Sequence, residues 1–118
     1  MTINILGTPW KITTKKYDED EIFERNSFCG YCDPYKKEIV LCDMNTYKGW
    51  ENDDEETKTN CHKTNLRHEI THAFFYESGL WDNTNHQVGA WAKNEELIDW
   101  IAIQGMKIFK AWKEVDAL

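Results

Sequence analysis

Residues 66–74 read LRHEITHAF, and this stretch predicts the helix around which the rest of the chain is organised. Its apolar residues recur at helical spacing: Leu66, Ile70, Ala73 and Phe74. Gly79 stands where a glycine commonly ends a helix, because it adopts the left-handed backbone conformation without strain. The pattern therefore predicts a helix over about residues 60–78.

The same stretch contains a His-Glu-x-x-His motif, formed by His68, Glu69 and His72. Two histidines four residues apart project from one face of a helix, so both imidazoles can reach one tetrahedral Zn²⁺ at about 2.0–2.1 Å. Glu69 would lie beside the ion without being a ligand, where it can take a proton from zinc-bound water. The motif predicts a catalytic zinc site but supplies only two of its protein ligands, so a third must come from elsewhere in the chain.

A last helix, predicted over about residues 94–113, supplies candidates for that ligand. At about 100° per residue, Glu95 should border the apolar stripe of this helix, whereas Glu96 should face water. Asp99 follows Glu95 by one turn and could accept a hydrogen bond from the far ring nitrogen of a ligating histidine. The alternative interpretation is that Glu95 and Asp99 are solvated helix charges.

Together, His68-Glu69-x-x-His72 and Asn94-Glu95-x-x-x-Asp99 resemble the paired motifs of the gluzincin zinc peptidases, HExxH and NExxxD. The resemblance implies that His68, His72 and Glu95 are zinc ligands, that Glu69 is the general base, and that Asp99 orients a ligating histidine. The segments NILGTPWKI, GYCD, RHEITHAFFYESGL and NEELIDWIAIQ also resemble small metallopeptidase-like proteins of phages and prophages of Gram-positive bacteria. Those proteins are similar to the ImmA/IrrE group and to minimal gluzincins.

From this resemblance we expect residues 1–118 to form a single zincin-like metallopeptidase domain with one catalytic Zn²⁺. The expected substrate is a peptide or protein, with a phage or host regulator as one candidate. We expect no counterpart to the downstream domain of larger gluzincins, so their transition-state Tyr and His donors have no obvious equivalent among these residues.

The fold class follows from short alternating segments that precede the two helices. At this length the chain can bury one core. Strands are predicted in residues 2–7 and 10–17, and a hairpin in 26–33 and 37–44 with its turn at Asp33-Pro34. Residues 18–25 suit a helical turn or a loop. Residues 45–60 read as an exposed connection whose last residues could start a helix, and residues 80–93 read as a loop. We therefore expect an α+β fold in which a small, mostly antiparallel sheet packs on the motif helix, with the last helix beside it.

Charge and hydropathy exclude several partners. Fourteen Lys and Arg against twenty-one Asp and Glu give a formal charge of −7, which argues against nonspecific nucleic-acid and anionic-membrane binding. No apolar run approaches the roughly 20 residues of a membrane span, and the N-terminus does not read as a signal peptide. We expect a cytoplasmic protein of the bacterial host with reduced cysteines.

Other residues leave alternatives open. His86 is a candidate transition-state donor, a replacement ligand for Glu95, or a surface histidine. Tyr76 is a second candidate donor, although a core or rim aromatic is the simpler interpretation. The strand EIVLC, residues 38–42, could offer its edge to an extended substrate or simply pack in the core. The four cysteines suit buried thiols, or a second zinc site built on one CxxC half-site: Cys29, Cys32, Cys42 and Cys61.

The function that these residues favour is peptide hydrolysis through a zinc-activated water with Glu69 as general base. The alternative is a phage-derived binding or regulatory protein that is stabilised by zinc and has no peptidase activity. A site closed by a fourth protein ligand would favour that alternative. A nonpeptide hydrolase is a third hypothesis without positive support in the sequence.

Overall fold

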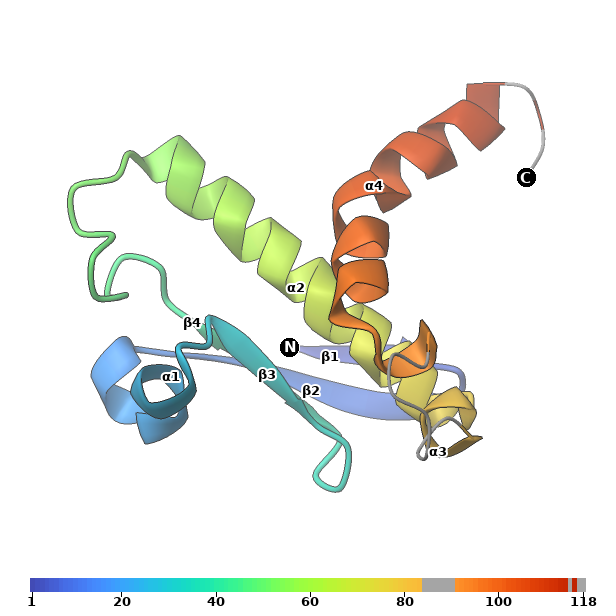
Figure 1. Ribbon diagram of the computed structural model, residues 1–118, viewed down its shortest axis with the longest axis horizontal. Helices are drawn as coiled ribbons and strands as arrows, with labels where there is room; N and C mark the ends of the chain where they lie inside the picture. Colours follow the sequence, from blue (N-terminus) through green and yellow to red (C-terminus); the bar gives the residue numbers. More distant parts are fainter. Residues whose placement is uncertain (84–90, 115, 117–118) are drawn as a thin grey trace.

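A four-stranded mixed sheet lies beneath one long diagonal helix in the computed structural model, which describes residues 1–83, 91–114 and 116 (Figure 1). The strand order is β1-β2-β4-β3. The strand bounds are β1 Thr2–Ile5, β2 Thr8–Lys15, β3 Gly30–Asp33 and β4 Glu38–Cys42. The β1-β2 and β3-β4 pairs are antiparallel, and the β2-β4 pair is parallel. The predicted α+β class is confirmed, with one parallel pairing inside the sheet.

The helices are α1 Glu21–Asn26, α2 Glu55–Glu77, α3 Leu80–Asn83 and α4 Glu95–Glu114, with short 3-10 turns at Tyr17–Glu19 and Trp91–Lys93. The helix predicted from about residue 60 begins earlier, because the Asp54 side chain caps it and accepts a hydrogen bond from the Thr57 backbone at 2.7 Å. Gly79 follows it with φ +79°, as expected. Residues 80–83 and 91–93 are helical rather than loop-like.

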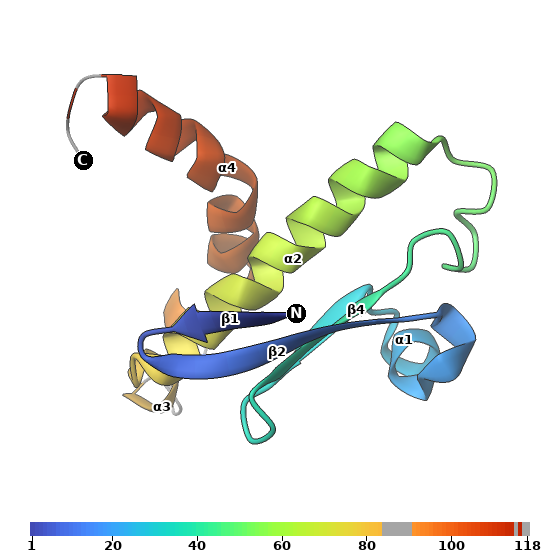
Figure 2. The ribbon, with the colours of Figure 1, turned by 180° about the vertical axis from the view of Figure 1, so that it is seen from behind.

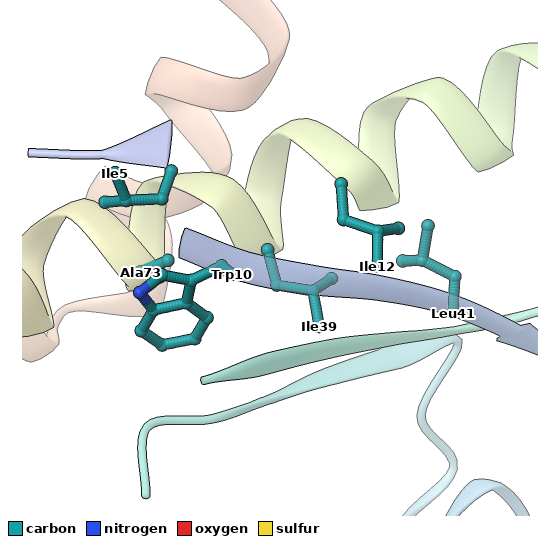
Figure 3. Packing of buried hydrophobic residues seen from close by; sticks show 6 residues of the cluster. All are labelled: Ile5, Trp10, Ile12, Ile39, Leu41 and Ala73. Atoms are coloured by element: carbon teal, nitrogen blue, oxygen red, sulfur yellow. The ribbon is translucent and has the colours of Figure 1, made fainter. Parts of the chain in front are cut away.

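The main core lies between the sheet and α2, as Figure 3 shows. Its buried members are Ile5, Trp10, Ile12, Ile39, Leu41 and Ala73. Strand β4 is buried on both faces, because Val40 and Cys42 pack with Phe23 of α1 in a second cluster. An interior strand covered on both sides needs a continuous apolar run, which explains EIVLC.

Helix α4 packs on α2 only through its first half. Ile98 and Ala102 are buried, and the Arg67 guanidinium on α2 donates a hydrogen bond to the Ala102 carbonyl. Beyond this contact the two helices diverge, as both views of the ribbon show (Figures 1 and 2). The crossing therefore holds the beginning of α4 against the middle of α2. Within residues 1–83 and 91–114, no helix is long and apolar enough to cross a membrane.

Candidate metal centre

The two motif histidines lie on the side of α2 that meets α4. The Nε2 atoms of His68 and His72 are 3.0 Å apart, and their rings meet edge to face with centroids 4.7 Å apart. The His68 side chain is 20% exposed and that of His72 is 11% exposed. Helical spacing and partial burial thus direct two ring nitrogens at one point.

Glu95, the first residue of α4, brings its carboxylate to the same point. Its Oε2 atom lies 3.2 Å from Nε2 of His68, and its Oε1 atom lies 3.4 Å from Nε2 of His72. The prediction that Glu95 borders the core is wrong, because its side chain is 64% exposed. The buried face of α4 is formed by Ile98 and Ala102, so Glu95 reaches the histidines from the solvent side. Glu96 is exposed, as expected.

These three side chains fit the ligand set of a tetrahedral zinc ion. Ligand bonds of about 2.0–2.1 Å at tetrahedral angles place the ligand atoms about 3.3–3.4 Å apart. The separations of 3.0, 3.2 and 3.4 Å are close to that value. We call the side chains of His68, His72 and Glu95 the ligand triangle.

Asp99 determines which nitrogen of His68 is available to a metal. Its Oδ1 atom lies 2.6 Å from Nδ1 of His68. An ionised carboxylate can only accept hydrogen bonds, so Nδ1 carries a hydrogen, and Nε2 is the nitrogen that the neutral imidazole offers to a metal. In that neutral form the Nε2 lone pair faces the Glu95 carboxylate at 3.2 Å, and a cation between the two would be attracted by both.

The surroundings of His72 also favour metal binding. Burial lowers its pKa, and this effect outweighs the opposing attraction of the Glu95 carboxylate. The neutral imidazole that burial favours is the form that binds metals. Its Nδ1 atom is buried and has no hydrogen-bond partner within the described residues.

Glu69 lies beside the ligand triangle but is buried, with 6% of its surface exposed. Ligand atoms of His68, Glu69 and His72 all lie within 4.8 Å of one another. The pKa of Glu69 is raised to about 7, chiefly by burial; the neighbouring His68 lowers it, and the carboxylates of Glu95 and Asp99 raise it. A carboxyl group with this pKa can both accept and donate a proton near neutral pH.

A cleft of about 400 Å³ opens over these groups. Besides the four site residues it is lined by Phe28, Gly30, Tyr31, Cys32, Tyr76 and Trp81. Of the two alternatives for residues 38–42, core packing holds and a free edge does not, because β4 lies between β2 and β3. Strand β3 is the edge strand at the cleft.

Sequence reasoning missed β3 as a wall of the site. Gly30 is buried, and a Cβ atom added there would lie 2.9 Å from a Leu41 methyl group, 3.0 Å from the Val40 carbonyl oxygen and 3.5 Å from Cγ of Glu69. A glycine within a strand often marks such a close approach, and this signal was present in GYCD.

The other residues for which the sequence suggested a role are Tyr76, His86 and the four cysteines. Tyr76 packs against the core and its ring centroid lies 4.5 Å from that of Trp81, so it is a rim aromatic of the cleft. His86 lies outside the described residues. All four cysteines are free, and in the described part of the chain none of them belongs to a group of three potential metal ligands. The second zinc site is therefore not supported.

No family model, no curated protein and no solved structure matches this chain.

Proposed function

We propose that this protein is a zinc-dependent metallopeptidase. The observation that carries the proposal is the ligand triangle, with atoms 3.0–3.4 Å apart, beside the buried carboxyl group of Glu69 in an open cleft. An isolated ion-pair network would not need a glutamate excluded from water next to its histidines. The arrangement suits hydrolysis because it combines three ligands with a neighbouring proton acceptor.

In this proposal His68, His72 and Glu95 hold the metal and Asp99 orients His68. Bound zinc would lower the pKa of a water molecule toward about 7 and polarise the scissile carbonyl. Glu69 accepts the proton of the attacking water and passes it to the leaving amine. Its burial leaves the carboxyl group exposed only at the wall of the cleft, where the attacking water would lie.

A peptide is the proposed substrate because the cleft is bordered by a free strand edge. Cys42 donates its backbone N–H to the carbonyl of Cys29 at 2.8 Å. In an antiparallel pair every second residue hydrogen-bonds to the partner strand, so the backbone N–H and C=O groups of Tyr31 also point toward β4. Gly30 and Cys32 therefore direct their backbone groups outward, toward the cleft that both residues line. An extended peptide could add to this edge as a further strand. The sequence resemblance suggests a phage or host regulator as one such substrate.

The experiment is a comparison of Glu69→Gln with the parent and with Glu96→Gln, an exposed neighbour of the ligand Glu95. Zinc content and cleavage of a mixed quenched-fluorescent peptide library are measured on all three. We expect Glu69→Gln to keep one zinc and lose at least about a hundredfold in turnover, because general-base catalysis contributes 10²–10⁴-fold. Glu96→Gln should match the parent in both measurements. Cleavage by Glu69→Gln at the parent rate contradicts the mechanism.

The competing function is a binding protein that zinc stabilises. The observation in its favour is that Glu69 lies within 4.8 Å of both histidines, close enough to become a fourth ligand after a small shift. In that case Glu69→Gln would release zinc and lower the thermal stability together, because a closed structural site contributes folding free energy. Retention of zinc by this variant would reject the closed site.

A further inference from the structure

A second cavity, of about 180 Å³, lies at the opposite end of α2 from the ligand triangle. It is formed by the first turns of α2, strand β2 and the residues that follow β4: Thr14, Asp43, Met44, Asn45, Glu55, Lys58, Thr59 and His62. None of these residues lines the cleft over the ligand triangle. The proposed peptidase mechanism gives this cavity no role.

Lys58 is the unusual residue in this cavity. Its side chain is only 10% exposed, although lysine is rarely buried without a partner. The nearest carboxylate oxygen, Oε1 of Glu55, lies 4.0 Å from its ammonium nitrogen, which is beyond hydrogen-bond distance. Within the described residues the Lys58 ammonium donates no hydrogen bond. A lysine side chain that is largely buried and makes no such bond is unusual, and its ammonium lies at the cavity, where a ligand would pair with it.

Two carboxylates also border the cavity, and they limit what the ligand can be. The Asp43 carboxylate accepts a hydrogen bond from the Asn45 backbone at 3.0 Å through Oδ1, and within the described chain this carboxylate accepts no second one. The Glu55 side chain is 82% exposed. A simple anion would attract Lys58 but repel Asp43 and Glu55, and a simple cation would do the reverse.

A molecule that carries both charges close together satisfies both sides. We propose that this cavity binds a small free amino acid, with its carboxylate on the Lys58 ammonium and its own ammonium at the Asp43 and Glu55 carboxylates. The volume of about 180 Å³ corresponds to roughly six water molecules at ~30 Å³ each, which suits an amino acid with a short side chain. The hydroxyl groups of Thr14 and Thr59 and the Asn45 amide provide further hydrogen-bonding groups at the wall.

The test is an NMR titration of the full-length protein with four probes: glycine, acetate, methylammonium and inorganic phosphate. We expect glycine to shift the backbone amides of Thr59 and His62 saturably. Acetate, methylammonium and phosphate should bind at least about tenfold more weakly, because each leaves a charged group of the cavity unpaired. Equal or tighter binding of acetate or phosphate would overturn the zwitterion proposal in favour of a simple anion site. Absence of saturable shifts with glycine would overturn the site altogether.

Two variants assign the binding to the named charges. Lys58→Met should abolish the glycine response, whereas Lys63→Met, an exposed lysine on the same helix, should leave it unchanged. If Lys58→Met does not fold, Asp43→Asn decides, because asparagine keeps the Oδ1 acceptor for the Asn45 backbone and removes only the charge. We expect Asp43→Asn to weaken glycine at least about tenfold without weakening acetate. Unchanged glycine binding in Asp43→Asn would show that the ligand's ammonium is not recognised there.

Discussion

Nδ1 of His68 lies 2.6 Å from Oδ1 of Asp99, although 31 residues separate the two in sequence. This hydrogen bond joins the middle of α2 to the beginning of α4. It directs the free nitrogen of His68 toward His72 and Glu95, and it fixes α4 at the turn that also carries Glu95. Metal affinity should therefore depend on a residue that does not itself contact the metal.

Replacement of Asp99 by alanine tests this dependence. The variant removes the acceptor of the His68 Nδ1–H bond, so the imidazole loses its fixed orientation and tautomer. We expect zinc affinity to fall by about 10–100-fold, as is typical for loss of such a partner. Competition with a chromophoric chelator measures the affinity, with Glu96→Ala as the matched control on the same turn. Equal affinities in the two variants would remove Asp99 from the site.

The zinc content of Glu95→Ala tests the third ligand. We expect one equivalent of zinc in the parent, measured by elemental analysis after dialysis, and a loss of most of it in Glu95→Ala because two histidines alone bind zinc weakly. His86→Ala is the comparison, since the sequence makes His86 the rival ligand. If Glu95→Ala retained zinc and His86→Ala lost it, His86 rather than Glu95 would be the third ligand.

Gly30→Ala tests the close approach of β3 to the site. The new methyl group would meet the Leu41 side chain and the Val40 carbonyl oxygen at 2.9 and 3.0 Å. Overpacking of this kind costs about 1–3 kcal/mol, which urea denaturation would detect. Strand β3 must shift relative to β4, which moves the wall of the cleft beside Glu69, so turnover should fall while zinc content stays at one equivalent.

Gly105→Ala is the matched control for this prediction. Gly105 lies in α4, and a Cβ atom there would meet nothing within 4 Å. Alanine favours a helix over glycine by up to about 1 kcal/mol, so this variant should gain stability. A gain in stability for Gly30→Ala as well would show that β3 has room at the site.

Glu77 should make stability depend on pH. Its carboxylate accepts hydrogen bonds from Lys37 at 2.6 Å, Trp10 at 2.8 Å and Thr8 at 3.0 Å, and these bonds, led by that of Lys37, lower its pKa below 4.5. A lowered pKa in the folded state stabilises the fold above the unfolded value, and this contribution is lost as pH falls through the folded value.

Glu77→Gln should therefore destabilise the protein at pH 7 by about 1–2 kcal/mol, because it removes the charge that Lys37 and Trp10 contact. The difference from the parent should shrink steadily below pH 4.5, as the parent carboxylate becomes protonated. Urea denaturation at pH 7, 5, 4 and 3 measures it, with exposed Glu24→Gln as control. A difference that is constant across this range would contradict the lowered pKa.

The elements that the sequence predicted best are those with a strong local signal. Alternation gave β1 and β2, and helical spacing gave α2 and α4, because these patterns reflect one buried face. The start of α2 was missed by five residues, since residues 55–59 are polar and only the Asp54 cap extends the helix through them. The burial of Lys58 had no local signal at all, because it depends on β2 and the residues after β4 that lie beneath it.

For the candidate site, the spacing of His68 and His72 required only helical geometry, so the sequence determined it. The resemblance suggested that Glu95 and Asp99 belong with them, but the sequence placed Glu95 at the border of the core, and it is exposed. Only the crossing of α2 and α4 brings those carboxylates within 2.6–3.4 Å of the histidines.

The sequence by itself thus determined the motif helix, the α+β class and the pairing of two histidines on one face, because each depends on neighbours within a few residues. The tertiary structure decided that β3 rather than β4 is the free edge, that a side chain at residue 30 would clash with β4, and that the Lys58 side chain is buried at a second cavity. These features depend on strand order and helix crossing. They arise from contacts between distant segments, and local periodicity contains no information about such contacts.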